Sequence, residues 1–320
     1  MILRIGSRGS QLALWQANHI AALLRGQGYS VEIVIIKTTG DRLQQVTFAQ
    51  VGSKGMFTKE IEEALTAGSV DLAVHSLKDL PTALPGPFAL AAIPRRVDPR
   101  DAFVSLKFEN LAALPQGARV GSSSPRRRAQ LKALRRDIEA IEFRGNVDTR
   151  LRKLAEGQLD AILLAAAGLD RLERTEWLRE RLEPREFCPA AGQGALGIET
   201  RKDDAATIAA VQFLDDAATR FAVTAERAAL AALGGGCQVP IGIYCRSGLD
   251  EAAGTEAELW DEIFAVVAAP ETGTTVRVHH RETRHRMSHA DAEGLGRLAA
   301  QMLFDAGAGP LLQSPAGGLP

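Results

Sequence analysis

Aromatic residues and cysteines are scarce in this chain of 320 residues, and neither charge sign is in clear excess. Aromatics make up 5% of the sequence, which disfavours a surface built to stack nucleic-acid bases. The three cysteines, Cys188, Cys237 and Cys245, are an odd number without CxxC spacing, so neither a disulfide framework nor a cysteine-rich zinc site is expected. The net charge of −1 argues against a polycation that coats nucleic acid.

Long hydrophobic runs are also missing. Residues 161–167 form one of the longest apolar stretches, and they fall far short of a membrane span. The first ten residues, MILRIGSRGS, lack the apolar core of a secretory signal. We therefore expect a cytoplasmic protein with no membrane partner. The rest of the composition, 46% hydrophobic and 24% charged, is typical of a globular protein with two or three domains.

Strand and helix patterns alternate through the first two thirds of the chain, which predicts α/β units with mostly parallel sheets. The first unit combines expected strands at 3–5, 31–38 and 71–76 with expected helices at 12–27 and 59–69. The second combines expected strands at 118–122, 138–143 and 160–169 with expected helices at 125–136 and 146–158. Residues 94–105, rich in charge and proline, are expected to be the crossover between the units.

The last hundred residues follow a different pattern. We expect helices at 217–233 and 290–306, a strand at 237–246, and antiparallel strands at 264–270 and 274–280. Residues 248–263 fit either a helix or a loop, and the tail from 307 is expected to fray. This region predicts a smaller third domain.

Basic residues gather in one part of the sequence. Residues 119–153 carry a formal charge of +7, so the rest of the chain carries −8. A solvated helix face would explain such a run equally well for most of these arginines. Arg126 and Arg127, however, follow Ser124 and Pro125, an N-cap and first-turn pair that opens a helix. Free N–H groups and guanidinium groups at a helix start favour anions. Arg135 lies at the other end of the same helix, so replacing it is expected to have little effect on the binding of an anionic ligand.

The same combination of arginine and small polar residues recurs at Arg8 before Ser10 and at Arg144 before Asn146. Because ligands of open α/β sheets bind beyond the carboxyl ends of the strands, these turns predict one crevice for a polyanionic ligand. Lys78 and Asp79 follow an expected strand and come to the same edge, although a surface ion pair is an equally good reading.

One histidine and the three cysteines are interpreted individually. His75 is expected to be a packed strand residue, and nothing near it has metal-ligand spacing. Cys237 directly follows Gly234, Gly235 and Gly236, a flexible link that suits a thiol presented to a ligand. Cys188 and Cys245 lack that setting and are expected to be small buried hydrophobes.

Nine ordered blocks of the sequence resemble the porphobilinogen deaminase (hydroxymethylbilane synthase) family. They are SRGSQLALWQ, GSKGMFTKEIE, DLAVHSLKDLP, DPRDAFVS, the SSSPRR stretch, FRGNVDTRL, AAAGLDRL, AAGQGALGIE and GGGCQVPIG. The resemblance implies a fold of three domains, two doubly wound lobes like those of periplasmic binding proteins and a small α/β domain with an antiparallel sheet. On this chain we expect domain 1 at 1–94 plus about 195–213, domain 2 at about 99–190, domain 3 at about 217–308, and a tail at 309–320.

The resemblance also implies an activity, a cofactor and site residues. The family joins four porphobilinogen molecules head to tail, releases ammonia and yields the linear tetrapyrrole hydroxymethylbilane. It builds on a dipyrromethane cofactor held by a thioether, and the matching cysteine is Cys237. The catalytic aspartate matches Asp79, and a mobile loop matches Lys54 and Phe57. Cofactor- and substrate-binding positions match Arg8, Ser10, Lys78, Ser122, Ser123, Ser124, Arg126, Arg127, Arg144, Gly145, Asn146, Arg150, Arg171 and Gln193. No metal, nucleic-acid partner or second subunit is implied, so we expect a monomer.

Two other classes of protein remain possible from the residues alone. A non-enzymatic two-lobed anion-binding protein would share the fold, because fold does not fix function. A nucleic-acid-binding module would use residues 126–136. Neither alternative predicts a covalent group on Cys237.

Overall fold

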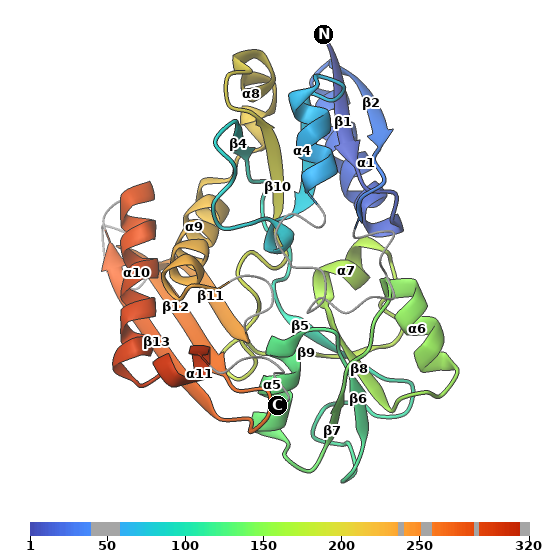
Figure 1. Cartoon of the computed structure of the whole chain (residues 1–320), viewed down its shortest axis with the longest axis vertical. Helices are drawn as coiled ribbons and strands as arrows, with labels where there is room; N and C mark the ends of the chain where they lie inside the picture. The colour runs from blue at the N-terminus through green and yellow to red at the C-terminus, as the bar shows by residue number, and fades with distance from the viewer. Residues whose placement is uncertain (40–57, 236–239, 251–257, 285–287, 314–320) are drawn as a thin grey trace.

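The computed structural model describes residues 1–39, 58–235, 240–250, 258–284 and 288–313, and within them the chain forms three β-sheets (Figure 1). Three predicted site residues, Lys54, Phe57 and Cys237, lie outside the described residues. No helix in the described part of the chain is long and apolar enough to cross a membrane.

The first sheet has the strand order β2-β1-β3-β10-β4. Its strands are β1 (Ile2–Ser7), β2 (Ser30–Ile35), β3 (Leu72–Ser76), β4 (Phe88–Ala92) and β10 (Leu196–Arg201). The associated helices are α1 (Gln11–Gly26), α4 (Lys59–Thr66), η1 (Leu77–Asp79), α8 (Ala205–Val211) and η2 (Gln212–Leu214). β1 is parallel to β2 and β3, whereas β10 is antiparallel to β3 and β4. The apolar face of α1 packs on the sheet through Ile20 and Leu24, as the helical spacing of these residues predicts.

The second sheet repeats this arrangement in the order β7-β6-β8-β5-β9. Its strands are β5 (Asp101–Val104), β6 (Arg119–Gly121), β7 (Glu139–Ile141), β8 (Ala161–Ala165) and β9 (Leu178–Leu182). Its helices are α5 (Pro125–Leu134), α6 (Val147–Ala155) and α7 (Ala166–Arg171). β6 is parallel to β7 and β8, and β5 is antiparallel to β8 and β9. Separate apolar clusters pack on the two faces of this sheet.

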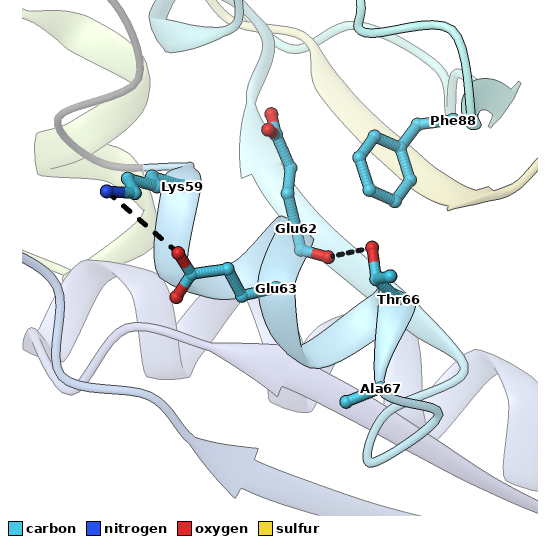
Figure 2. Close-up of a pocket in the computed structure, with 6 residues that line it drawn as sticks. All are labelled: Lys59, Glu62, Glu63, Thr66, Ala67 and Phe88. Carbon is cyan, nitrogen blue, oxygen red and sulfur yellow. Dashed lines mark hydrogen bonds and ion pairs between the residues drawn. The ribbon is translucent and has the colours of Figure 1, made fainter.

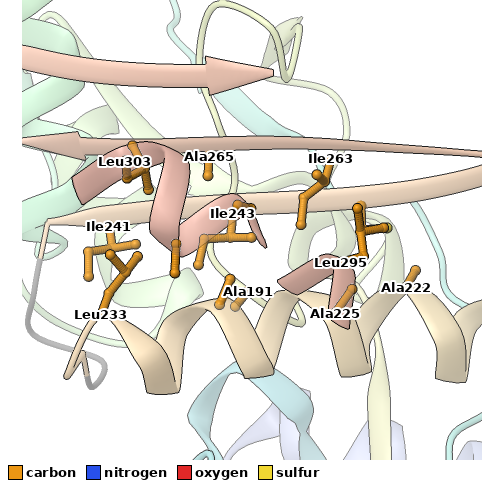
Figure 3. Packing of buried hydrophobic residues seen from close by; sticks show 14 of the residues in the cluster. Ala191, Ala222, Ala225, Leu233, Ile241, Ile243, Ile263, Ala265, Leu295 and Leu303 are labelled. Atoms are coloured by element: carbon orange, nitrogen blue, oxygen red, sulfur yellow. The ribbon is translucent and has the colours of Figure 1, made fainter. Parts of the chain in front are cut away.

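The third sheet is antiparallel and has the order β11-β12-β13. Its elements are α9 (Ala217–Ala232), β11 (Ile241–Asp250), β12 (Glu258–Ala268), β13 (Thr275–Arg284), α10 (His289–Asp305) and α11 (Gly309–Gln313). Alternate residues of β11 and β12, such as Ile243 and Ile263, pack against α9 and α10 (Figure 3). The helices approach closely because a Cβ on Gly296 of α10 would lie 2.2 Å from the Ala225 carbonyl oxygen of α9. Side-chain-free glycine permits this contact.

Two segments connect the first sheet to the second, residues 93–100 between β4 and β5 and residues 183–195 between β9 and β10. They run side by side, since the Val97 N–H donates to the Gly194 carbonyl at 3.4 Å. Gly194 has a φ of +88°, and a Cβ there would lie 2.6 Å from the Val97 oxygen. Only glycine fits this position without strain.

The fold class is confirmed as α/β with two doubly wound sheets and a small antiparallel sheet. Four local predictions were wrong. Within the expected crossover, β5 is a strand with four buried residues between β8 and β9. The expected strand 160–169 ends at residue 165, because the alanines that follow start α7. The described parts of 248–263 are strand, and residues 309–313 form α11, whose leucines pack on the third core.

Candidate active site

Helix starts on both large sheets position the polar side chains that the sequence singles out. Ser10 caps α1 by accepting from the Ala13 N–H at 3.3 Å, and Ser124 caps α5 by accepting from the Arg127 N–H at 3.4 Å. Asn146 precedes α6 but makes no capping bond with its side chain. α7 lies beside α1 (Figure 1), and the Arg171 guanidinium is 5.8 Å from the centre of the Trp15 ring. Residues far apart in sequence therefore meet where the two large sheets face each other.

A buried polar group, the Asp101 cluster, joins both large sheets and consists of Lys78, Asp101, Arg126, Arg127 and Gln193. The Asp101 carboxylate is fully buried and accepts from Arg126 Nη1 at 2.7 Å, Arg127 Nε at 2.8 Å and Gln193 Nε2 at 2.9 Å. Gln193 Oε1 in turn accepts from Arg127 Nη2 at 3.2 Å and Lys78 Nζ at 3.4 Å. The two guanidinium groups and these hydrogen bonds hold the pKa of Asp101 far below its usual range despite burial.

The two arginines at the start of α5, Arg126 and Arg127, already have hydrogen-bond partners within the Asp101 cluster. Arg126 Nη1 also donates to the Cys188 carbonyl at 2.6 Å, and Nη2 donates to Asp101 at 3.2 Å, so both terminal nitrogens already have partners within the protein. A ligand carboxylate at Arg126 or Arg127 would share these donors with Asp101. Sequence reasoning missed Asp101, although a carboxylate that opens an otherwise apolar strand, DAFV, is a signal that could have found it.

Arg150 and Arg171 differ from these paired arginines, because no carboxylate among the described residues pairs with either of them. Arg150 Nη2 donates to the Ser123 hydroxyl at 3.0 Å, and Arg171 Nη2 donates to the Gly194 carbonyl at 2.8 Å. The Nε atom of each is buried without a hydrogen-bond partner. Burial lowers the pKa of each guanidinium to about 10. Arg171 is buried and Arg150 is half-buried, and partly desolvated cations without a paired carboxylate are costly, so this arrangement favours an anionic ligand.

Lys78 and Asp79 lie in the short helix η1 at the carboxyl end of β3. Lys78 is half-buried, and its desolvation, aided by the charge of Arg127, lowers its pKa to about 8. The Asp79 side chain is exposed and accepts no hydrogen bond from the described residues. A carboxylate in this position is accessible to a ligand and near two cationic groups.

The other predicted site residues lie outside the Asp101 cluster. Arg8 is half-buried before α1, and Arg144 forms an ion pair with Glu142 at 2.6 Å. Ser122 is buried and accepts from the Ser124 N–H at 3.2 Å. Gly145 has a φ of +128° and so permits the turn into α6.

Four residues outside the predicted site also carry predictions about their burial or their role. Cys188 and Cys245 are both 1% exposed, as expected, and burial raises the pKa of the Cys188 thiol to about 12. His75 is a packed strand residue, as expected, and its Nε2 lies 2.9 Å from the buried Glu199 carboxylate. Arg135 donates to the carbonyls of residues 111, 112 and 114 and so contacts a loop, and its expected small effect on ligand binding stays a prediction.

A shallow pocket on α4 lies apart from these residues (Figure 2). It is lined by Lys59, Glu62, Glu63, Thr66, Ala67 and Phe88. Lys59 and Glu63 form a weak exposed ion pair at 4.0 Å across one turn of the helix. None of the predicted binding residues lines this pocket, so it is not the candidate site.

The fold is that of an α/β protein with two doubly wound sheets and an added antiparallel domain, and the Asp101 cluster links the two doubly wound sheets. Residues 3–209 match the family described as porphobilinogen deaminase, dipyromethane cofactor binding domain, and residues 220–305 match the porphobilinogen deaminase C-terminal domain. The chain belongs to the porphobilinogen deaminase family. It is a transferase of tetrapyrrole biosynthesis, and the dipyrromethane cofactor is the cofactor of its family.

Curated relatives agree along nearly the whole chain. Porphobilinogen deaminase of Nitratidesulfovibrio vulgaris (strain DSM 19637 / Miyazaki F) is 49% identical, with 97% of this chain and 96% of that protein covered. The protein of the same name from Trichlorobacter lovleyi is also 49% identical, with the same two coverages. Among solved structures, the methionine-binding protein MetQ is 13% identical with a TM-score of 0.44, covering 67% of this chain and 89% of that chain. We draw no conclusion from a likeness that distant.

Proposed function

We propose that this chain joins four porphobilinogen molecules head to tail into hydroxymethylbilane and releases one ammonia for each. In this proposal the dipyrromethane cofactor is attached through a thioether to Cys237, and Asp79 is the catalytic acid and base. The observation that carries the proposal is the pair of guanidinium groups of Arg150 and Arg171. Their Nε atoms are buried without a hydrogen-bond partner, and neither group has a carboxylate partner among the described residues. Each pyrrole unit brings an acetate and a propionate group, so the ligand supplies the missing negative charge.

The residues present fit the cofactor. Its carboxylates suit the unpartnered Nε atoms of Arg150 and Arg171, and the flanking Ser123 hydroxyl adds a neutral donor. Arg127 and Lys78 extend this cationic surface toward Asp79. When bound, the cofactor supplies the pyrrole carbon to which the first substrate is joined.

Asp79 performs the proton transfers of the proposed mechanism. As the acid, its carboxyl gives a proton to the amine of porphobilinogen, which leaves as ammonia. The resulting Asp79 carboxylate stabilises the cationic methylene-pyrrole derived from the substrate. When the new carbon–carbon bond forms, the same carboxylate accepts the proton released from the pyrrole carbon, which restores the acid.

The remaining parts of the proposal rest on motif matches to the family. Proposed binding residues beyond these are Arg8, Ser10, Ser122, Ser124, Arg126, Arg144, Gly145, Asn146 and Gln193, and the proposed covering loop contains Lys54 and Phe57. The proposed domain limits follow the segments that build the three sheets. That the enzyme is a monomer and works in the cytoplasm also stays a prediction.

Replacing Arg150 by leucine tests the anionic ligand. We expect the cofactor-free variant to be at least as stable as wild type, because a half-buried cation without a paired carboxylate is removed. We also expect affinity for porphobilinogen-like carboxylates to fall by about tenfold or more, the value of a charge-assisted hydrogen bond. Thermal melting and calorimetric titration measure the two effects. The matched control is Arg136→Leu, since Arg136 is exposed. A variant that melts lower but binds normally would show that Arg150 is structural.

Lys78 predicts a pH dependence of ligand binding. Its pKa is lowered to about 8 by burial, so the free site carries this positive charge below pH 8 and loses it above. A bound carboxylate favours the charged form. Affinity for a pyrrole with acetate and propionate groups but no aminomethyl group should therefore fall as pH rises from 8 to 10. Lys78→Arg should remove this fall, because arginine stays charged. Equal pH profiles for the two proteins would rule out Lys78 as the titrating contact.

A further inference from the structure

A second pocket, with a cavity volume of about 220 Å³, lies where the segment after β9 crosses the outer face of the third sheet. Pro184, Arg185 and Cys188 of that segment line one side, and Phe264, Arg277 and His279 of β12 and β13 line the other. We call it the Arg277 pocket. None of the proposed cofactor- and substrate-binding residues lines it.

Strand register brings the sheet residues of this pocket together. His279 is opposite Phe264, and Arg277 is opposite Val266, so these side chains share the face of the sheet turned away from α9 and α10. The Phe264 and His279 rings stack with centroids 4.5 Å apart and an interplanar angle of 2°. The Arg185 guanidinium lies 5.5 Å from the centre of the Phe264 ring. The aromatic stack therefore holds His279 and Arg185 at the pocket in fixed positions.

The pocket contains more positive than negative charge. Glu262, fully buried beneath it, accepts from Arg185 at 3.1 Å, Arg246 at 2.6 Å and His279 at 2.7 Å. One carboxylate therefore serves three basic side chains. No such partner exists for Arg277 among the described residues. Burial lowers the pKa of Arg277, and the nearby exposed Glu186 offsets only part of this effect.

Arg277 is only weakly satisfied by the protein. Its two terminal nitrogens donate to the Arg185 carbonyl and to Gln130 Oε1, both at 3.4 Å, which is long for a hydrogen bond. These two bonds use two of the five N–H donors of the guanidinium, so the other three are available for a ligand that enters the pocket. The fork geometry matches the oxygen atoms of phosphate and carboxylate groups.

We propose that the Arg277 pocket binds a small oxyanion with two or more negative charges, a phosphate or a polycarboxylate, with Arg277 as the main contact and Arg185 and His279 at its rim. A cavity of this volume is smaller than the pockets that hold drug-sized ligands, which favours an anion of few atoms. The ligand would bridge residues 184–188 and β13. Cys188 separates this pocket from the Asp101 cluster, because its carbonyl accepts from Arg126.

Calorimetric titration of the cofactor-loaded, full-length enzyme tests the proposal. Inorganic phosphate and citrate are titrated separately, and the tighter one identifies the class of anion. We expect one saturable site, weakened about tenfold or more by Arg277→Gln. Arg281→Gln is the matched control, because Arg281 lies on the same strand face, 4.5 Å from the Trp260 ring and outside the pocket. It should bind as wild type does.

Circular dichroism shows whether each variant folds. If Arg277→Gln does not fold, Arg185→Gln replaces it, since the Arg185 side chain is 65% exposed and its loss should also weaken binding. The proposal is overturned if neither anion binds saturably or if the folded pocket variants bind as tightly as wild type. It is also overturned if binding is lost in Arg150→Leu instead, which would place the anion at the candidate active site.

Discussion

Changing Cys237 to serine should abolish covalent attachment of the cofactor and, with it, the synthesis of hydroxymethylbilane. A serine hydroxyl is a far weaker nucleophile than a thiolate and cannot form the thioether. The glycines before Cys237 follow α9, where Gly234 has a φ of +68° and the Gly235 N–H donates to the Leu230 carbonyl at 3.0 Å. Intact mass spectrometry of the purified variant measures attachment directly.

The two other cysteines supply the matched controls for this experiment. Cys188 and Cys245 are buried, and the pKa of Cys188 is raised to about 12, so neither side chain is suited to react with a ligand. Cys188→Ala and Cys245→Ala should therefore keep the cofactor mass. A Cys237→Ser protein that still carries the cofactor would show that the attachment site has been misassigned.

Changing Asp79 to asparagine should reduce turnover by at least about a hundredfold, the lower range for a positioned acid–base group. Asparagine is nearly isosteric but can neither carry the charge nor transfer the proton. The Asp79 side chain is exposed and accepts no hydrogen bond from the described residues, so the variant should fold normally. Single-turnover rates with the variant loaded with preformed cofactor separate the chemical step from cofactor assembly.

Asp203→Asn is the control for this second change, because Asp203 is exposed and follows β10, away from the carboxyl end of β3. It should turn over at the wild-type rate. A loaded Asp79→Asn enzyme that turned over nearly as fast as wild type would remove Asp79 from the mechanism.

Local signals in the sequence were sufficient for the parallel strands of both large sheets and for several helix starts, but not for β4, β9 or β10. Ser124 caps α5 as predicted, and Ser10 caps α1 in the same way, since a cap depends on residues three positions apart. The end of β8 could not be predicted, because alanines at 165–167 fit strand and helix alike until the sheet edge is known. β5 was hidden by the charged residues that precede it.

The ion-pair partners of the site were beyond sequence reasoning. Asp101 is 25 positions from Arg126 and 92 from Gln193, and no periodic pattern links such residues. The arginines could be predicted as a group from their positions at helix starts. Arg126 pairs with a carboxylate of the protein and Arg150 does not. This difference depends on how α5 and α6 pack around the second sheet.

The most direct test of the account follows the mass of the intact enzyme during a limited reaction. The cofactor-loaded wild-type protein is mixed with substoichiometric porphobilinogen, quenched and examined by mass spectrometry. The account predicts a ladder of species, each heavier than the last by one porphobilinogen less one ammonia, that is absent in Cys237→Ser. An enzyme that consumes porphobilinogen while its own mass stays unchanged would contradict assembly on a protein-bound primer.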